Sequence, residues 1–338
     1  MRPLRRALLT LAVIVGGCAV YFSVRLAIVE GWFAGAPAVS PAVCRAIAPG
    51  LGGLRDMEVD AAHNAMLISA AGAAADSPGG IYWLKLEARS AAPVKVQTGL
   101  RDFHPGGIAL YRGADGAETL YAINRRARGR PAIEIFALSY ADGVPKLTQQ
   151  SSIESGQLVS PHDLAVAGPE RFYVTNDHGS NNRLGRFAED WLLLPFADLL
   201  SFNGQTFRAA VTRIASASGV LATPDGQYLY VSAANDRRLL AFRREPFLGT
   251  LTEIGSLAIP AKPGNIGVDG GGNLIVAGAA GAGSQVFRVS RGKDGVPTGY
   301  QTIFSDDGGR MARAGSAAVW NHHLFVGSPD KILDCAMK

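Results

Sequence analysis

The feature that most constrains the fold is a strand–turn–strand unit that occurs six times along the chain. The clearest copy is 160–178, SPHDLAVAGPERFYVTNDH, where the apolar run 164–167 is followed by a Gly-Pro-Glu turn and a second apolar run at 172–175. The turn returns the chain on itself, as turns rich in Gly and Pro do between strands. The other copies begin near residues 53, 106, 218, 264 and 315.

The spacing of these units predicts an all-β fold, a six-bladed β-propeller. Consecutive units begin about 50 residues apart, which is the length of one propeller blade. Four units are followed by a third alternating segment, at 81–86, 133–138, 239–242 and 286–289. The glycines lie in turns between strands, so neither a Rossmann nor a P-loop motif is present, and no zinc-protease motif occurs.

The N-terminus predicts a membrane anchor. Residues 7–24 are apolar and free of charge, which is just long enough to span a bilayer. Arg2, Arg5 and Arg6 precede the span and only Arg25 follows it at once, so the positive-inside rule leaves the rest of the chain outside. We therefore expect a signal anchor at 1–25, a linker at 26–42 and a propeller at 43–338, facing the periplasm or the cell exterior.

Two other fates of the N-terminus fit the sequence. The run Val15-Gly16-Gly17-Cys18 resembles a lipoprotein cleavage box, although the residues after it stay apolar. A small-residue cleavage site lies at 34–36, but far beyond the apolar core. Of the net charge of +5, residues 1–40 contribute +3, so the chain has no clustered basic face and nucleic-acid binding is not expected.

The cysteines suggest how the ends of the exported part are held. Cys18 falls in the apolar span, while Cys44 and Cys335 stand at the two ends of the remaining chain. In an oxidising compartment such a pair favours a disulfide that ties the ends together. Two unrelated buried thiols are the alternative.

The segment 188–200, AEDWLLLPFADLL, departs from the strand pattern. Its apolar residues suit a short helix or an inserted loop. Packing against the edge of the propeller explains it without a function. The functional readings are a lid over the central opening or a patch that touches the membrane.

Inner strands of a propeller begin near its central channel, so their first side chains should converge. Asp56 and Asp163 are the two carboxylates among these starts. With backbone carbonyls and water, two carboxylates make a plausible site for a hard cation such as Ca²⁺. Alternatively, each aspartate caps a turn through backbone N–H groups.

Several segments resemble the paraoxonase/arylesterase family. The third unit carries the most specific match, from His162 to His178. The supporting matches are Phe103-His104-Pro105, Pro224-Asp225-Gly226 with Tyr228, Asn265-Ile266 with Val268-Asp269, and the terminal cysteines. The similarity extends over about residues 7–337. It implies a six-bladed propeller with two calcium ions in the channel, a disulfide joining the ends, and hydrolysis of lactones and aryl esters.

The resemblance carries over unevenly to the metal sites. Asp56, Ile108 (through its carbonyl) and Asp163 match the ligands of the structural calcium. At the positions of the catalytic calcium stand Arg55, His162, Ser218 and Gly264-Asn265, and only Asn265 is retained. A fixed positive charge at Arg55 disfavours a second dication. We therefore expect one calcium ion, the structural one.

The family's catalytic histidines are replaced as well. They would fall at Gly106 and Arg125, and His104 is the nearest histidine to the first. Three hypotheses follow: a hydrolase with a rebuilt site, a non-catalytic ligand- or protein-binding propeller, and hydrolysis through an altered metal site. A sugar-lactone hydrolase of the gluconolactonase type fits less well, because its first-blade carboxylate is also replaced by Arg55.

In the rebuilt site, Arg55 would hold a carbonyl or carboxylate, and His162, or His104, would act as a catalytic group. Ser218 and Asn265 would bind the ligand, a small ester or lactone. The neighbouring pair Asp177-His178 also matches the family, but such a pair at a strand end can equally be a structural hydrogen bond.

Overall fold

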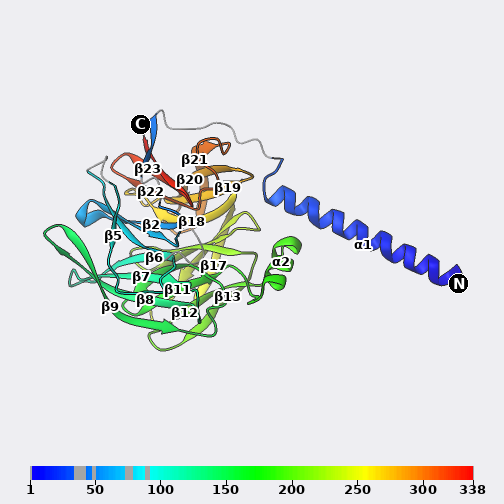
Figure 1. Ribbon diagram of the computed structural model, residues 1–338, viewed down its shortest axis with the longest axis horizontal. Coiled ribbons are helices and arrows are strands. Elements are labelled where there is room, and N and C mark those ends of the chain that lie inside the picture. The colour runs from blue at the N-terminus through cyan, green and yellow to red at the C-terminus, as the bar shows by residue number, and fades with distance from the viewer. Residues whose placement is uncertain (1, 34–42, 48–50, 73–78, 88–91, 338) are drawn as a thin grey trace.

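The strands of the protein form six four-stranded sheets, which are the blades of a six-bladed β-propeller (Figure 1). The structure is a computed structural model that describes residues 2–33, 43–47, 51–72, 79–87 and 92–337. The predicted all-β fold is confirmed. Within each of blades 1 to 5 the four strands follow one another along the chain, each pairing antiparallel with the next.

Blades 1 to 3 are formed by the first half of the chain. Blade 1 consists of β2 (Leu54–Asp60), β3 (Ala65–Ala70), β4 (Gly80–Lys85) and β5 (Val94–Val96). Blade 2 consists of β6 (Pro105–Arg112), β7 (Glu118–Asn124), β8 (Ala132–Ala141) and β9 (Val144–Glu154). Blade 3 consists of β10 (Pro161–Gly168), β11 (Arg171–Asn176), β12 (Ala197–Phe202) and β13 (Phe207–Ile214).

Blades 4 to 6 follow in the second half. Blade 4 consists of β14 (Ala217–Ala222), β15 (Tyr228–Ala233), β16 (Arg238–Arg244) and β17 (Leu251–Ala258). Blade 5 consists of β18 (Lys262–Val268), β19 (Leu274–Ala280), β20 (Gly283–Arg291) and β21 (Pro297–Asp306). Blade 6 consists of β22 (Ser316–Trp320), β23 (His323–Ser328), β24 (Lys331–Ala336) and β1 (Val43–Ile47).

The core lies between the faces of neighbouring blades. Every residue of β3 and of β15 is buried, because both faces of these strands are covered by adjacent sheets. Between blades 2 and 3, Tyr121 packs on Phe172, which stacks on Phe202 with ring centroids 4.8 Å apart. A blade cannot bury these apolar faces alone, so each one depends on its neighbours.

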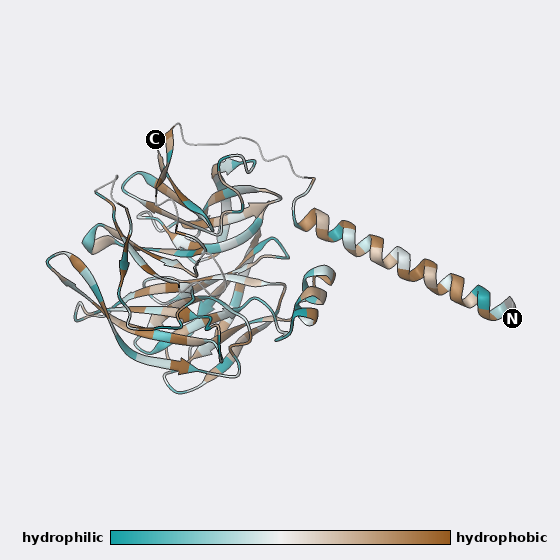
Figure 2. Cartoon of the chain, viewed as in Figure 1, coloured by the Kyte–Doolittle hydropathy of each residue, from teal (hydrophilic) through white to brown (hydrophobic). Residues whose placement is uncertain are grey.

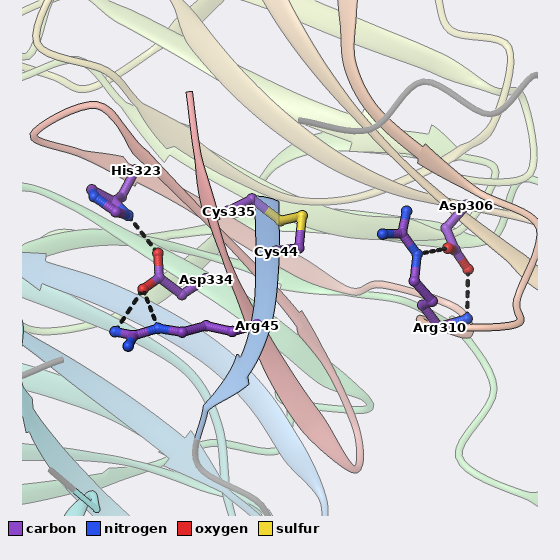
Figure 3. The surroundings of a disulfide bond; sticks show 7 residues. All are labelled: Cys44, Arg45, Asp306, Arg310, His323, Asp334 and Cys335. Carbon is purple, nitrogen blue, oxygen red and sulfur yellow. Dashed lines mark hydrogen bonds and ion pairs between the residues drawn. A yellow bond between two sulfur atoms is a disulfide. The ribbon is translucent and has the colours of Figure 1, made fainter. Parts of the chain in front are cut away.

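The sixth blade closes the ring by pairing the two ends of the propeller. Strand β1 pairs antiparallel with β24, and the register places Cys44 opposite Cys335, where the two form a disulfide (Figure 3). The predicted pairing is confirmed. Beside it, Asp334 receives a hydrogen bond from Arg45 and is paired with His323. In the chain-entropy description, closing so long a loop stabilises the fold by more than about 4 kcal/mol.

Helix α1 (Arg2–Val29) projects from the propeller (Figure 1). Its Pro3–Val29 stretch is long and apolar enough to cross a membrane, with a mean hydropathy of 2.2 (Figure 2). The helix includes residues 26–29, which the sequence analysis assigned to the linker, and residues 34–42 of that linker lie outside the described residues. At 1.5 Å per residue, α1 is about 40 Å long.

Helix α2 (Arg183–Leu192) interrupts blade 3 between β11 and β12. The expectation for 188–200 was partly wrong: the helix begins five residues earlier, at Arg183, and residues 197–200 belong to β12. Asn182 caps the helix by accepting a hydrogen bond from the Gly185 N–H. Trp191 contacts α1, with its ring 6.1 Å from that of Phe22. The segment therefore joins the propeller to α1.

Candidate functional site

A break in pairing marks the start of the inner strand in five blades. In β2, β6, β10, β14 and β18 the register shifts between the first residues and the rest of the strand. Residues inside such a bulge leave the regular ladder, and bulges often re-aim side chains toward active sites. Arg55, His162, Ser218 and Asn265 all lie in these breaks.

The four residues line one cavity at the strand starts. This outer cavity has a volume of about 390 Å³. All six blades contribute to its lining, through residues on or next to their first two strands. The lining residues are Leu54, Arg55, Gly106, Arg125, His162, Ser218, Lys262, Gly264, Asn265, Ala279, Arg313, Ala314, Gly315, Gly327, Ser328 and Pro329. The sequence therefore located residues that meet in space, although they come from four blades.

The charged side chains of the outer cavity are all cationic. Arg55, Arg125, Lys262 and Arg313 line it, and no Asp or Glu does among the residues that the structure describes. The guanidinium of Arg125 is fixed by an Nε hydrogen bond to the Pro161 carbonyl, 2.9 Å. A cavity with this lining attracts anions and developing negative charge.

His162 is the titratable group among these cations. It is half-buried, and its Nδ1 atom is buried with no hydrogen-bond partner among the described residues. Burial, and then the charge of Arg125, lower the pKa of His162 to about 4. The imidazole is therefore neutral near pH 7, with an unpaired nitrogen.

Ser218 and Asn265 are already held by other groups. The Ser218 hydroxyl donates to the Pro263 carbonyl at 2.7 Å, so its proton is not available to a ligand in this arrangement. The Asn265 amide donates to Asp56 Oδ1 at 2.6 Å and to the Arg55 carbonyl at 3.3 Å. Asn265 thus connects the outer cavity to a second cavity deeper in the channel.

This inner cavity is small, about 90 Å³, and lies among the carboxylates Asp56, Glu58 and Asp163. Asp56 Oδ2 accepts from the Ile108 N–H at 3.0 Å, and its Oδ1 accepts from Met57 and from Ser316. The aspartate of blade 1 is therefore bonded to the inner strand of blade 2.

Asp163 repeats this arrangement two blades further on. Its Oδ1 accepts from the Leu164 N–H at 2.8 Å, and its Oδ2 accepts from the Val220 N–H of blade 4 at 2.9 Å. Gly107 is required beside it, because a Cβ there would lie 2.4 Å from Asp163 Oδ1. Both aspartates cap backbone N–H groups, as the turn-capping interpretation expected.

Three acids crowd the inner cavity. Burial raises the pKa of Asp56, and burial together with the charge of Asp56 raises that of Asp163. Burial and then Asp56 raise the pKa of Glu58 to about 8. The sequence analysis missed Glu58, although side chains two residues apart on a strand lie on the same face, which places it with Asp56.

The inner cavity offers oxygen donors of the type that a hard cation takes, although Asp56, Glu58 and Asp163 do not have ligand atoms all within 4.8 Å of one another. Carboxylate oxygens from Asp56, Glu58 and Asp163 face a small cavity that Ile108 also lines, and oxygen ligands of this kind are those that Ca²⁺ takes. A cation would also offset the repulsion among the three acids. Asp56, Ile108 and Asp163 therefore stay predicted ligands of one calcium ion.

His104 lies outside the outer cavity lining. Its Nδ1 is 3.1 Å from the Ala71 carbonyl and its Nε2 is 3.4 Å from Asp102 Oδ1. Both ring nitrogens are thus engaged at the junction of blades 1 and 2. The structure does not bring this predicted catalytic residue to His162 and Arg55.

The pair Asp177-His178 forms a bridge to α2. His178 Nδ1 is 2.8 Å from Asp177 Oδ1, and its Nε2 is 3.2 Å from Asp190 on the helix. The bond to Asp177, then that to Asp190, raises the pKa of His178 to about 10. Burial raises the pKa of Asp177, but the bond to His178 and neighbouring charges outweigh it and lower the pKa. The geometry is that of a structural ion pair.

A further acidic cluster lies away from the channel cavities. Asp60, His63 and Glu118 have ligand atoms within 4.8 Å of one another, the only His, Cys, Asp or Glu group of metal-binding spacing in the described part of the chain. Arg112 pairs with both acids, and Tyr140 donates to Asp60 and stacks on His63. Both acids of the cluster are thus already engaged by side chains of the protein.

Comparison with known proteins identifies the family. The sequence model of the arylesterase family matches residues 66–337. The chain belongs to the arylesterase family. Serum paraoxonase/arylesterase 2 of Bos taurus is 24% identical over 272 residues, which is 75% of each chain. Serum paraoxonase/lactonase 3 of Homo sapiens matches with the same identity and coverage.

Solved structures share the family's fold at lower identity. The calcium-binding protein regucalcin of Agrobacterium tumefaciens superposes with a TM-score of 0.56 at 14% identity, covering 89% of this chain and 96% of that one. At this identity the likeness extends to the fold. This chain combines buried aspartates in the inner cavity with a cationic outer cavity.

Proposed function

We propose that the protein is an arylesterase/lactonase-like hydrolase whose site is built from protein cations in place of a catalytic metal ion. The observation that carries the proposal is the convergence of Arg55, Arg125 and His162 in one cavity. Family membership supports a hydrolase and the substrate class, a small ester or lactone.

The proposed chemistry assigns one task to each group. The guanidinium groups of Arg55 and Arg125 bind the carbonyl oxygen and stabilise the negative charge that develops on it. His162, which lines the same cavity, accepts a proton from the attacking water. Calcium in the inner cavity, held by Asp56, Asp163 and the Ile108 carbonyl, would supply structural cross-linking between blades.

A non-catalytic ligand-binding propeller is the second candidate. It is favoured by the Ser218 hydroxyl, which donates to the Pro263 carbonyl. It is also favoured by the outer cavity lining, in which no described residue is a carboxylic acid that could protonate a leaving group. In this case the same cations bind a ligand and release it without chemical change.

Hydrolysis of phenyl acetate and of δ-valerolactone by the full chain separates the two candidates. We expect turnover that Arg55→Gln and His162→Gln each lower by about 10²-fold, the size of losing one oxyanion donor or a general base. His322→Gln is the matched control, since His322 is exposed and outside both cavities.

Mild chelation distinguishes the rebuilt site from an altered metal site. A rebuilt site keeps its turnover in EDTA for as long as the propeller stays folded. Turnover lost at once in EDTA, with folding unchanged, would assign the chemistry to a metal ion. If the folded protein hydrolyses neither substrate, the non-catalytic ligand-binding propeller is the remaining candidate.

We also propose that α1 holds the propeller on a membrane, on its periplasmic or extracellular side. The apolar length of α1 supports attachment, and the Cys44–Cys335 disulfide suggests an oxidising compartment. The apolar side chains Leu184, Phe187 and Phe196 are exposed around α2, which contacts α1. Protease digestion of intact cells or spheroplasts should cleave the propeller, whereas a cytoplasmic propeller would be protected.

A further inference from the structure

The outer cavity has an excess of positive charge that one carboxylate from outside the propeller partly balances. That carboxylate is Glu30, in the residue that follows α1. Its Oε1 is 2.6 Å from Lys262 Nζ, and its Oε2 is 3.4 Å from the guanidinium of Arg313. Lys262 and Arg313 are two of the four cations that line the cavity.

The position of Glu30 is fixed by the way the end of α1 is seated. The Gly281 N–H donates to the Glu30 carbonyl at 2.6 Å, and Arg237 donates to the Ile28 carbonyl at 3.2 Å. Gly31 adopts a φ of +77°, and a Cβ there would lie 2.9 Å from Gly281 N. The helix end therefore sits on the β19–β20 turn with a close contact that needs glycine.

The other two cations have no such partner. Arg55 has no ion pair among the described residues, and Arg125 is bonded to a neutral carbonyl. Asp177 lies near Arg125, but its carboxylate is already bonded to His178 and Ser160. Glu30 thus pairs with two of the four cations and leaves Arg55 and Arg125 without an ion pair among the described residues, in a concave site where the fields of the four cations add.

We propose that the outer cavity binds a small organic carboxylate, and that Glu30 is an internal carboxylate that competes with it for Lys262 and Arg313. This proposal rests on the proposed function for the ligand-binding cavity, and it specifies that the ligand is an anion. It does not require that the protein hydrolyses the ligand. A ligand carboxylate would pair with Arg55 and Arg125 first, because Glu30 does not reach them by any described contact. Removing the Glu30 charge would free the other two cations.

The test compares benzoate with benzamide, two probes of the same shape of which only benzoate is charged. Binding to the full chain in detergent is measured by calorimetry at low ionic strength. We expect benzoate to bind at least about tenfold more tightly than benzamide, since two guanidinium groups face its carboxylate. Glu30→Gln should tighten benzoate binding by about twofold to fivefold, the range for a partly exposed ion pair.

Three variants make the outcome decisive. Glu253→Gln removes an exposed charge elsewhere and should leave benzoate affinity unchanged. Arg55→Gln should weaken benzoate binding and leave benzamide binding as it was, and a thermal unfolding curve checks that each variant is folded. Equal affinity for benzoate and benzamide in folded wild-type protein would overturn the anion site. Equal benzoate affinity of Glu30→Gln and Glu253→Gln would overturn the competition by Glu30.

These readouts are independent of hydrolysis. A protein that binds benzoate in the expected way but turns over neither phenyl acetate nor δ-valerolactone keeps this proposal and loses the proposed hydrolase. A protein that hydrolyses both substrates but does not discriminate benzoate from benzamide keeps the hydrolase and loses the anion site.

Discussion

The outer and inner cavities are separated by one residue step on the same strands, yet cationic side chains line the first and carboxyl groups line the second. On β2, Arg55 lines the outer cavity and Asp56 the inner one. On β10, His162 and Asp163 divide in the same way. The inner residues bond the backbone of the next blade, whereas the outer ones are free of the sheet ladder. Asn265 lines both cavities and bonds to Asp56, but in the part of the chain that the structure describes the other outer residues make no hydrogen bond to the inner carboxylates. We therefore expect the outer layer to tolerate changes in chemistry while the inner layer keeps the propeller together.

The largest expected difference is in the free energy of unfolding, between a substitution at Asp163 of the inner layer and one at its neighbour His162 of the outer layer. Asp163→Ala leaves the Leu164 and Val220 N–H groups without their buried acceptor. We expect it to lower the free energy of unfolding by about 2 to 5 kcal/mol, and His162→Ala to lower it by about 1 kcal/mol or less. Thermal or urea unfolding of both variants measures this. Similar losses at the two positions would show that the layers are not separate.

Calcium should act on the inner layer alone. We expect one ion per chain, stabilising the wild-type protein by about 2 to 3 kcal/mol when calcium is present at 100 times its dissociation constant. Asp163→Asn should abolish the effect, and Arg55→Gln should leave it in place. Calorimetric titration gives the number of ions, and unfolding with and without EDTA gives the stabilisation. A count of two ions would contradict the exclusion of a dication by the outer cations.

The smallest effect concerns the pair Asp177-His178, which bridges to α2. The pKa of His178 rises to about 10 in the folded protein, from about 6.5 in the unfolded chain. Its stabilising effect is therefore complete below pH 6.5 and is lost as pH rises through about 10. His178→Gln should cost about 1 kcal/mol near pH 6 and much less at pH 10. Unfolding curves at the two pH values check this, and an equal cost at both would rule out the charged pair.

The fold was accessible from the sequence because propeller repeats are local. The two strands and the turn of each unit lie within about 25 residues of one another, so the sequence pattern alone predicts them. The closure of the ring was predicted from Cys44 and Cys335 at its two ends. Blade 3 was the exception. The insertion of α2 separated β11 from β12, so the apolar residues of β12 were assigned to the same segment as the helix.

The sequence predicted those residues of the candidate site that lie at the start of an inner strand. Arg55, His162, Ser218 and Asn265 were found by that rule and do share a cavity. Arg313 was missed because it lies in the loop before β22, and Lys262 because it stands before the glycine of its unit. No sequence pattern pointed to Glu30, because only the contact of the end of α1 with the β19–β20 turn brings Glu30 to the cavity.

The bond between Cys44 and Cys335 makes the propeller a covalent ring of polypeptide. A protease that cuts one loop between blades therefore releases no fragment, because both pieces remain attached through the sixth blade. A nicked molecule would keep its mass until a thiol is added, and only then separate into two chains.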